Sequence, residues 1–184
     1  MMAGVNTSSA AVARRIPPDS VGAELGVWRG DTSALFLTTR KVKHLHLVDT
    51  WSVGPYTSVA DFYTRYAHIV GGATPEVFQA YYDRVHAAVA NRFAEAPVTI
   101  HRVTTQEFLA DAPKLDWVYV DASHEYEDVL RDLQACAAIV PLIFGDDYGN
   151  KPGVVQAVDE FAAANDSWTL EVFAKNQFQL TRGA

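Results

Sequence analysis

The sequence predicts an α/β fold in which a single doubly wound, mostly parallel sheet is covered by helices on both faces. Short apolar, strand-like runs alternate with stretches of helical periodicity along almost the whole chain. The 184 residues suit one domain with a sizeable core, and neither an internal repeat nor a linker interrupts them. Right-handed crossovers between parallel strands make such a sheet Rossmann-like.

The chain opens on small residues and two arginines without the continuous apolar segment of a secretory signal, so we do not expect one there. We expect residues 1–15 to be a flexible tail or a short helix and residues 16–184 to form the domain. The elements predicted in the first half of the chain are a strand at 21–27, a turn and helix at 28–40, a strand at 44–51 that closes at Asp49, and helices within 52–96.

The second half alternates more regularly between the two kinds of element. Its last two strand-like runs are separated only by Asn176, which is most simply an antiparallel hairpin. The predicted elements are strands at 98–103, 116–123 and 142–145, helices at 105–112, 125–140 and 153–165, and the hairpin strands at 169–175 and 177–182.

Composition narrows the classes of function. Apolar residues make up 49% and charged residues 20% of the chain, as in soluble globular proteins. A net charge of −7 argues against non-specific nucleic-acid binding and against a membrane surface. No apolar run approaches the ~18–20 residues of a spanning helix. The single cysteine, Cys136, permits no internal disulfide, so we expect a cytoplasmic protein.

Acidic residues follow the predicted strands at the ends where ligands bind in open α/β sheets. Asp49 closes the second strand, Asp121 lies at the end of the fourth, and Asp146 and Asp147 follow the fifth. Solubility alone would scatter charges over the whole surface, so this clustering favours a site along one rim of the sheet.

The first turn, ELGVWRG, carries Glu24, Gly26 and Gly30. Glycine after a strand lets the backbone turn sharply and approach a ligand, although a plain tight turn would show the same pattern. Asp49, nineteen positions past Gly30, can accept both hydroxyls of a ribose.

The bulky side chains within this turn disfavour a pyrophosphate, which needs small residues around the helix amides. The chain also lacks a P-loop. An adenosine ligand without phosphates remains, and S-adenosylmethionine (SAM) fits that description.

The combination of AELGVWRGDTS, LVDTW, VDASHEYEDVLRDL and GDDYGNKPGVVQAVDEF resembles class I SAM-dependent methyltransferases, and most closely the macrocin-type branch of sugar and small-molecule O-methyltransferases. The resemblance covers roughly residues 20–182. It implies a seven-stranded sheet of order 3-2-1-4-5-7-6 with an antiparallel last strand. The segment 52–96 would then supply a helical lid over the methyl acceptor.

The resemblance also implies a divalent cation, usually Mg²⁺, bound by Asp121, Asp146 and Asp147. Oxygen ligands without cysteine suit a hard cation, and a dication removes the repulsion between adjacent carboxylates. Side chains on a regular strand alternate between faces, so the two neighbouring aspartates can converge only if the strand has ended at Gly145. The alternative is that Asp146 caps a turn and Asp147 is solvated.

In some sugar methyltransferases of this family a histidine at the position of His124 acts as the general base, so the resemblance implies this role for His124. Imidazole suits that role near neutral pH. A locally bonded histidine at a helix start is the alternative. Trp51 could cover the adenine or ribose, or belong to the core. Thr105 and Gln106 could meet the adenine edge.

The sequence thus predicts methyl transfer from SAM to a hydroxyl of a sugar or small polyol, with Asp121 and His124 at the reacting centre. A homo-oligomer is possible. One alternative is a non-catalytic SAM-binding or metal-binding protein. Another is a nicotinamide-dependent oxidoreductase, which the bulky first turn and the lack of a Tyr-x-x-x-Lys pair disfavour.

Overall fold

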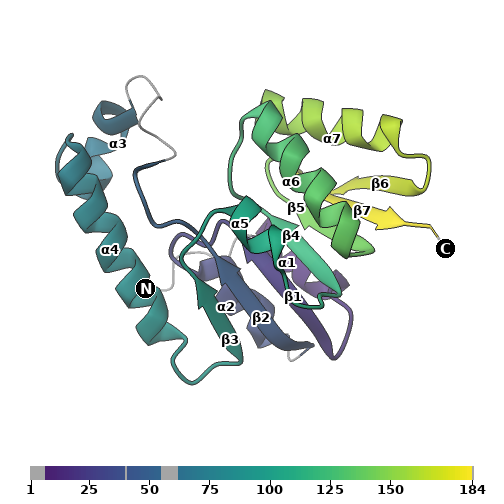
Figure 1. The fold of residues 1–184 in the computed structure, drawn as a ribbon, viewed down its shortest axis with the longest axis horizontal. Coiled ribbons are helices and arrows are strands. Elements are labelled where there is room, and N and C mark those ends of the chain that lie inside the picture. The colour runs from purple at the N-terminus through teal and green to yellow at the C-terminus, as the bar shows by residue number, and fades with distance from the viewer. Residues whose placement is uncertain (1–6, 40, 55–61, 184) are drawn as a thin grey trace.

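The computed structural model describes residues 7–39, 41–54 and 62–183, and these form a three-layered α/β domain (Figure 1). Its helices are α1 (Thr7–Arg15), α2 (Asp31–Thr38), α3 (Phe62–Val70), α4 (Pro75–Arg92), α5 (Thr105–Ala110), α6 (Tyr126–Ile139) and α7 (Pro152–Ala164). Its strands are β1 (Ser20–Leu25), β2 (Val42–Val48), β3 (Val98–His101), β4 (Trp117–Val120), β5 (Leu142–Gly145), β6 (Trp168–Phe173) and β7 (Gln177–Arg182).

The seven strands form one sheet of order β3-β2-β1-β4-β5-β7-β6, which confirms the predicted order. The pairs among β1 to β5 are parallel, and β7 runs antiparallel to both β5 and β6. The predicted terminal hairpin is therefore present, and β7 is the strand that runs against the direction of its neighbours in the sheet.

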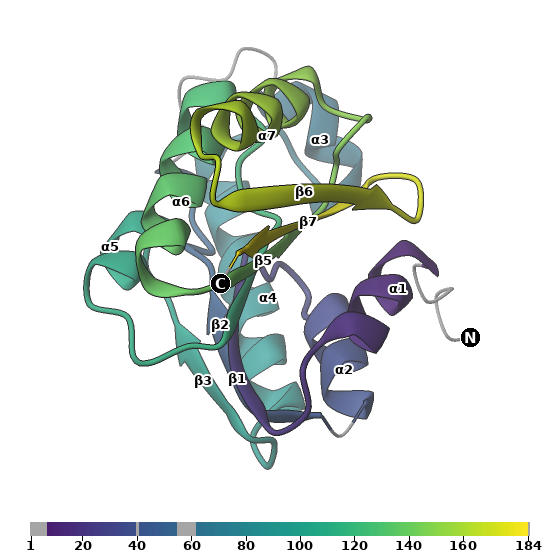
Figure 2. The same cartoon turned by 90° about the vertical axis from the view of Figure 1, so that its right-hand side faces the viewer.

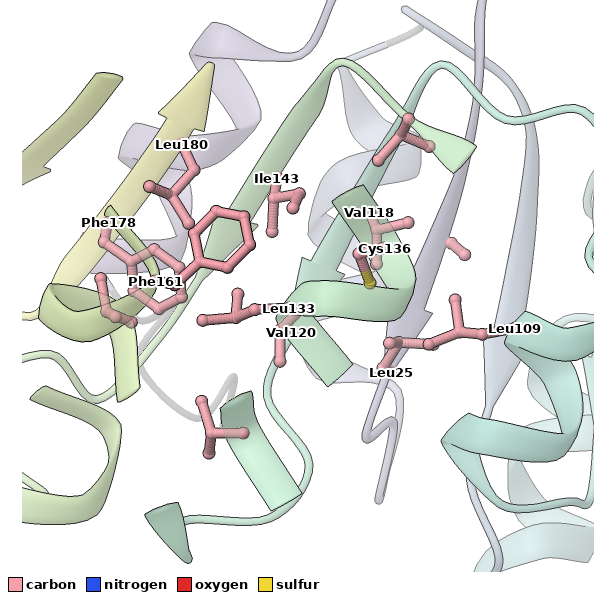
Figure 3. Packing of buried hydrophobic residues seen from close by; sticks show 14 of the residues in the cluster. Leu25, Leu109, Val118, Val120, Leu133, Cys136, Ile143, Phe161, Phe178 and Leu180 are labelled. Atoms are coloured by element: carbon pink, nitrogen blue, oxygen red, sulfur yellow. The ribbon is translucent and has the colours of Figure 1, made fainter. Parts of the chain in front are cut away.

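Helices cover both faces of the sheet, α1 and α2 on one side and α5 and α6 on the other (Figure 2). Strand β4 shows why both faces must be covered. Trp117 and Tyr119 point into the core under α2 and α4, whereas Val118 and Val120 point into the core under α6 and α7. All four residues are buried, as expected for a central parallel strand. Figure 3 shows the α6 side of this core, where Leu133 and Cys136 lie over the strands.

Helix α1 corrects one of the two alternatives for the first residues, because residues 7–15 are helix rather than flexible tail. Val12 and Ala13 are buried against the α2 side of the sheet. Arg15 at the end of α1 forms a two-pronged ion pair with Glu171 of β6, at 2.7 Å for both nitrogen–oxygen pairs. Its guanidinium also lies 3.9 Å from the centre of the Phe173 ring. These contacts hold the helix against the terminal hairpin.

The segment between β2 and β3 divides into two helices. The long helix α4 buries Phe78, Val85 and Val89, while α3 has no buried residue and contacts α4 through aromatic rings such as Phe62 against Phe78. Residues 55–61 of the predicted lid lie outside the described residues. Within the described ranges, no helix has the length and apolarity needed to cross a membrane.

Candidate functional site at the carboxyl ends of the strands

The carboxyl ends of β1, β2, β4 and β5 lie level with one another, so the residues that follow them share one rim of the sheet. The register pairs Leu25 with both Val48 and Val120. Backbone bonds continue past the strands, from the amide of Asp121 to the Leu25 carbonyl and from the amide of Asp146 to the Val120 carbonyl. The predicted gathering of aspartates on one rim therefore follows from the topology.

The first turn requires glycine at two positions. Gly26 has φ +91°, and a Cβ atom there would lie 1.9 Å from the carbonyl oxygen of Asp121. Gly30 has φ +74°, and its Cβ would lie 2.7 Å from the Phe93 ring. Only glycine combines a positive φ with such close approach. The turn after β1 is thus pressed directly against the backbone that follows β4.

Asp49 braces this turn with its carboxylate. One oxygen accepts from the amides of Val27 at 3.0 Å and Trp28 at 2.8 Å. The other oxygen accepts from the amide of Trp51 at 2.7 Å. The residue stands where a ribose-binding carboxylate was predicted, and three backbone donors fix its position.

Glu24 lies behind the rim, within β1. It is 1% exposed, and its carboxylate accepts a hydrogen bond from the Ser33 hydroxyl on α2. Burial raises the pKa of this carboxyl to about 8, although the Ser33 bond opposes the shift. In this arrangement Glu24 ties α2 to the sheet.

Trp51 is fully buried, with φ +41°. Its indole nitrogen donates to the Trp28 carbonyl at 2.9 Å, and its ring lies 4.8 Å from that of His86. Trp51 is therefore a core residue, which was one of the two alternatives that the sequence allowed; the other was a contact with the cofactor.

The other two residues proposed for the adenine edge are bonded to a carboxylate that the sequence analysis missed. Thr105 and Gln106 donate to the same oxygen of Asp132 at 2.7 and 2.6 Å. Asp132 is 4% exposed, and burial raises its pKa. The signal for it was a charged residue three positions after Val129 on the apolar face of α6.

The acid cluster lies at the ends of β4 and β5. Asp121, His124 and Asp147 each offer a ligand atom within 4.8 Å of the others. His124 Nε2 lies 2.8 Å from an Asp147 oxygen, and this hydrogen bond lowers the pKa of Asp147. Burial, followed by the charge of Asp146, raises the pKa of Asp121 well above its usual range. The protein surroundings therefore disfavour the charged form of Asp121.

Asp146, the third carboxylate of the predicted set, borders the same small hollow as Asp121 and His124 and is hydrogen-bonded to other partners. Its oxygens accept from the amide of Asp147 at 2.6 Å, from the Asn176 side chain and from the Tyr119 hydroxyl at 3.4 Å. Asp147 has φ +65°, and its carboxylate lies beside His124. Gly145 is needed for another reason, since a Cβ there would lie 2.2 Å from the Phe178 ring.

A larger hollow lies between α2 and α4, apart from the acid cluster. It has a volume of about 390 Å³ and borders three guanidinium groups and the Tyr81 ring. Arg92 is paired with Asp31 at 2.7 Å, and Arg29 donates to the Tyr81 hydroxyl at 2.8 Å. The hollow near Asp121, His124 and Asp146 is only about 10 Å³, the size of one water molecule.

Comparison with known proteins places this arrangement in a family. Residues 23–148 match the family model described as a methyltransferase domain, and the chain therefore belongs to that family. A search of curated protein sequences found no match.

Solved methyltransferase structures share the fold at low sequence identity. TomG, an O-methyltransferase from Streptomyces achromogenes involved in tomaymycin synthesis and solved with SAM, is 15% identical with a TM-score of 0.64, covering 100% of this chain and 82% of its own. The O-methyltransferase NovP is 20% identical with a TM-score of 0.59, covering 96% and 76%. A ribosomal protein L11 methylase from Lactobacillus delbrueckii subsp. bulgaricus is 13% identical with a TM-score of 0.59, covering 97% and 79%. Because these enzymes differ in acceptor, the fold alone does not select one.

Proposed function

We propose that this methyltransferase transfers the methyl group of SAM to a hydroxyl of a small molecule, a sugar or another polyol with adjacent hydroxyls. The observation that carries the proposal is the cluster of Asp121, His124 and Asp147 on the rim of a methyltransferase domain. The O-methyltransferases NovP and TomG, which share the fold, support oxygen as the acceptor atom.

The β1–β2 half of the rim would bind the cofactor. The glycine turn brings backbone close to a ligand, and Asp49 offers carboxylate oxygens to the ribose hydroxyls. SAM supplies an electrophilic methyl group, and the chain supplies the alignment of the acceptor oxygen with it, which accounts for much of the acceleration in such transfers.

Asp121 and Asp147 are the residues that would hold a divalent cation, because both are carboxylates in one cluster and burial penalises the charge on Asp121. Asp146 stands beside them; Asn176 and the amide of Asp147 both donate to its Oδ1, so Oδ2 is the atom that could join the cation. A bound Mg²⁺ would neutralise the carboxylates and lower the pKa of an acceptor hydroxyl.

His124 would accept the proton of the acceptor hydroxyl. Its Nε2 faces the Asp147 carboxylate, so the neutral ring donates from Nε2 and leaves Nδ1 as the basic atom. The carboxylate then stabilises the imidazolium that forms. This pairing repeats the general arrangement of a base oriented by a third group.

The remaining expectations belong to the same proposal. The segment 52–96 would cover the acceptor, with α3 as its outermost described part. The acidic net charge favours a small-molecule acceptor over a nucleic acid. We also propose that the protein is cytoplasmic and forms a homo-oligomer.

The proposal is tested by calorimetry with SAM, its demethylated product and NAD, each with and without MgCl₂. We expect the first two to bind and to raise the melting temperature, and NAD to do neither. A screen of polyols for release of the demethylated product then identifies the acceptor. Binding of NAD in place of SAM would contradict the proposal, and SAM binding without turnover on any hydroxyl would favour a non-catalytic role.

A further inference from the structure

Three histidines gather on one face of the sheet, on β2 and the edge strand β3. His44 and His46 are two positions apart in β2, and side chains alternate between the faces of a strand, so both lie on the same face. The ring of His46 lies 4.9 Å from that of His44 and 5.2 Å from that of His101. The proposed methyl transfer uses none of these side chains.

Two of the ring nitrogens face each other. His46 Nδ1 lies 2.9 Å from His101 Nε2, so one ring donates and the other accepts. Two imidazole nitrogens bound to one tetrahedral Zn²⁺ at about 2.0–2.1 Å stand about 3.4 Å apart. A small separation of the rings would therefore admit an ion between them.

We infer that His44, His46 and His101 form a binding site for a borderline dication such as Zn²⁺ or Ni²⁺. Imidazole is the ligand that these ions favour, whereas Mg²⁺ favours carboxylate oxygen. The site is thus chemically distinct from the cluster of Asp121 and Asp147.

Two of the three rings, those of His46 and His101, are in the protonation state that a metal needs. Burial, together with the neighbouring histidines, lowers the pKa of His46 to about 4. Burial also lowers the pKa of His101. Both rings are therefore neutral at pH 7. Both rings also contact Phe108, which is uncharged. On binding, the proton between the two rings moves to a remote ring nitrogen, and no net proton is released.

His44 completes the site. Its Nε2 lies 2.9 Å from the Thr99 hydroxyl, which leaves Nδ1 for the ion. Among the described residues, only Asp121, His124 and Asp147 already bring three such atoms within 4.8 Å, so His44 must turn toward its neighbours. Its side chain is only half-buried, which allows this movement. The ion would then join β2 to the four-residue edge strand β3.

The test is a calorimetric titration of tag-free, chelator-treated protein with ZnCl₂. We expect one equivalent to bind, His101→Gln to weaken binding by about 100-fold and His44→Gln by about tenfold. The exposed His68→Gln is the matched control and should bind as the wild type does. MgCl₂ should not compete for this equivalent. Asp147→Asn should retain it, which separates this site from the acid cluster.

A second measurement keeps the proposal testable if His101→Gln fails to fold. The electron paramagnetic resonance spectrum of Cu²⁺ bound to the Asp147→Asn variant should show nitrogen ligands, with one fewer in the double variant that adds His44→Gln. Zn²⁺ binding that survives His101→Gln but is lost in Asp147→Asn would overturn the proposal. A Cu²⁺ spectrum with oxygen ligands alone would overturn it as well.

Discussion

Asp49 in the β1–β2 half of the rim and Asp121 in the β4–β5 half have opposite surroundings. In the β1–β2 half, Asp49 accepts hydrogen bonds from the amides of Val27, Trp28 and Trp51. In the β4–β5 half, no described residue donates a hydrogen bond to the Asp121 carboxylate, and burial raises its pKa. The backbone itself satisfies the first charge, whereas the second needs a partner from outside the chain.

This difference separates a preorganised part of the site from a part that depends on a ligand. Asp49 is already held by backbone donors and needs no rearrangement when a cofactor binds. The charged form of Asp121 is unfavourable until a cation binds beside it. Four experiments test the contrast, from the largest expected effect to the smallest.

Asp147→Ala removes both a candidate cation ligand and the partner that orients His124. We expect kcat/KM for methyl transfer to fall by about 10²–10⁴-fold, the range for losing a positioned acid–base group. SAM affinity should change little, because the cofactor would contact the other half. An unchanged rate with an acceptor identified in the polyol screen would show that Asp147 takes no part in the mechanism.

Gly26→Ala attacks the point where the two halves touch. The added methyl group would lie 1.9 Å from the Asp121 carbonyl at a φ of +91°. We expect a loss of about 2–5 kcal/mol in the free energy of unfolding, measured with urea. Gly71→Ala is the matched control, since Gly71 also has φ +91° but nothing within 4 Å of its Cβ position. It should lose only about 1 kcal/mol. Equal losses would mean that strain alone, without the close approach, explains Gly26.

Asp49→Ala removes the brace of the β1–β2 half. Three amides lose their acceptor, and we expect the free energy of unfolding to fall by about 1–3 kcal/mol. The affinity for SAM, measured by calorimetric titration, should also fall. Destabilisation with full SAM affinity would confine Asp49 to a structural role.

Asp121→Asn should have the opposite sign in the absence of metal, a gain of about 1 kcal/mol. The native pKa is raised, so the folded state holds a proton that the unfolded state has released, and wild-type stability falls as pH rises above the ordinary value of 3.8. The variant should show a smaller slope in thermal melts recorded with EDTA, because the raised pKa values of Glu24 and Asp132 contribute the remainder. MgCl₂ should raise the wild-type melting temperature more than that of the variant.

Sequence patterns predicted the fold class and the rim because both depend on local regularities. Alternation of strand and helix predicted a mostly parallel sheet, and the positions of Asp49 and Asp121 after apolar runs placed them on one edge. The order of the strands was implied by the family resemblance and is confirmed. The directions of side chains were beyond such patterns. Asp147 contacts His124, whereas its neighbour Asp146 accepts a hydrogen bond from Asn176. Asp132 accepts hydrogen bonds from Gln106 and Thr105, which lie 26 and 27 positions away in the sequence. These depend on tertiary contacts that no short motif records.

The ion pair between Arg15 and Glu171 has a consequence for how the chain folds. It joins residues 156 positions apart, among the most distant contacts in the structure. Contacts of such long range form late, because the loop between them must first be ordered. The contact between α1 and the hairpin should therefore form after the central strands have assembled, whereas the packing of α1 on α2, its neighbour in the sequence, can form earlier.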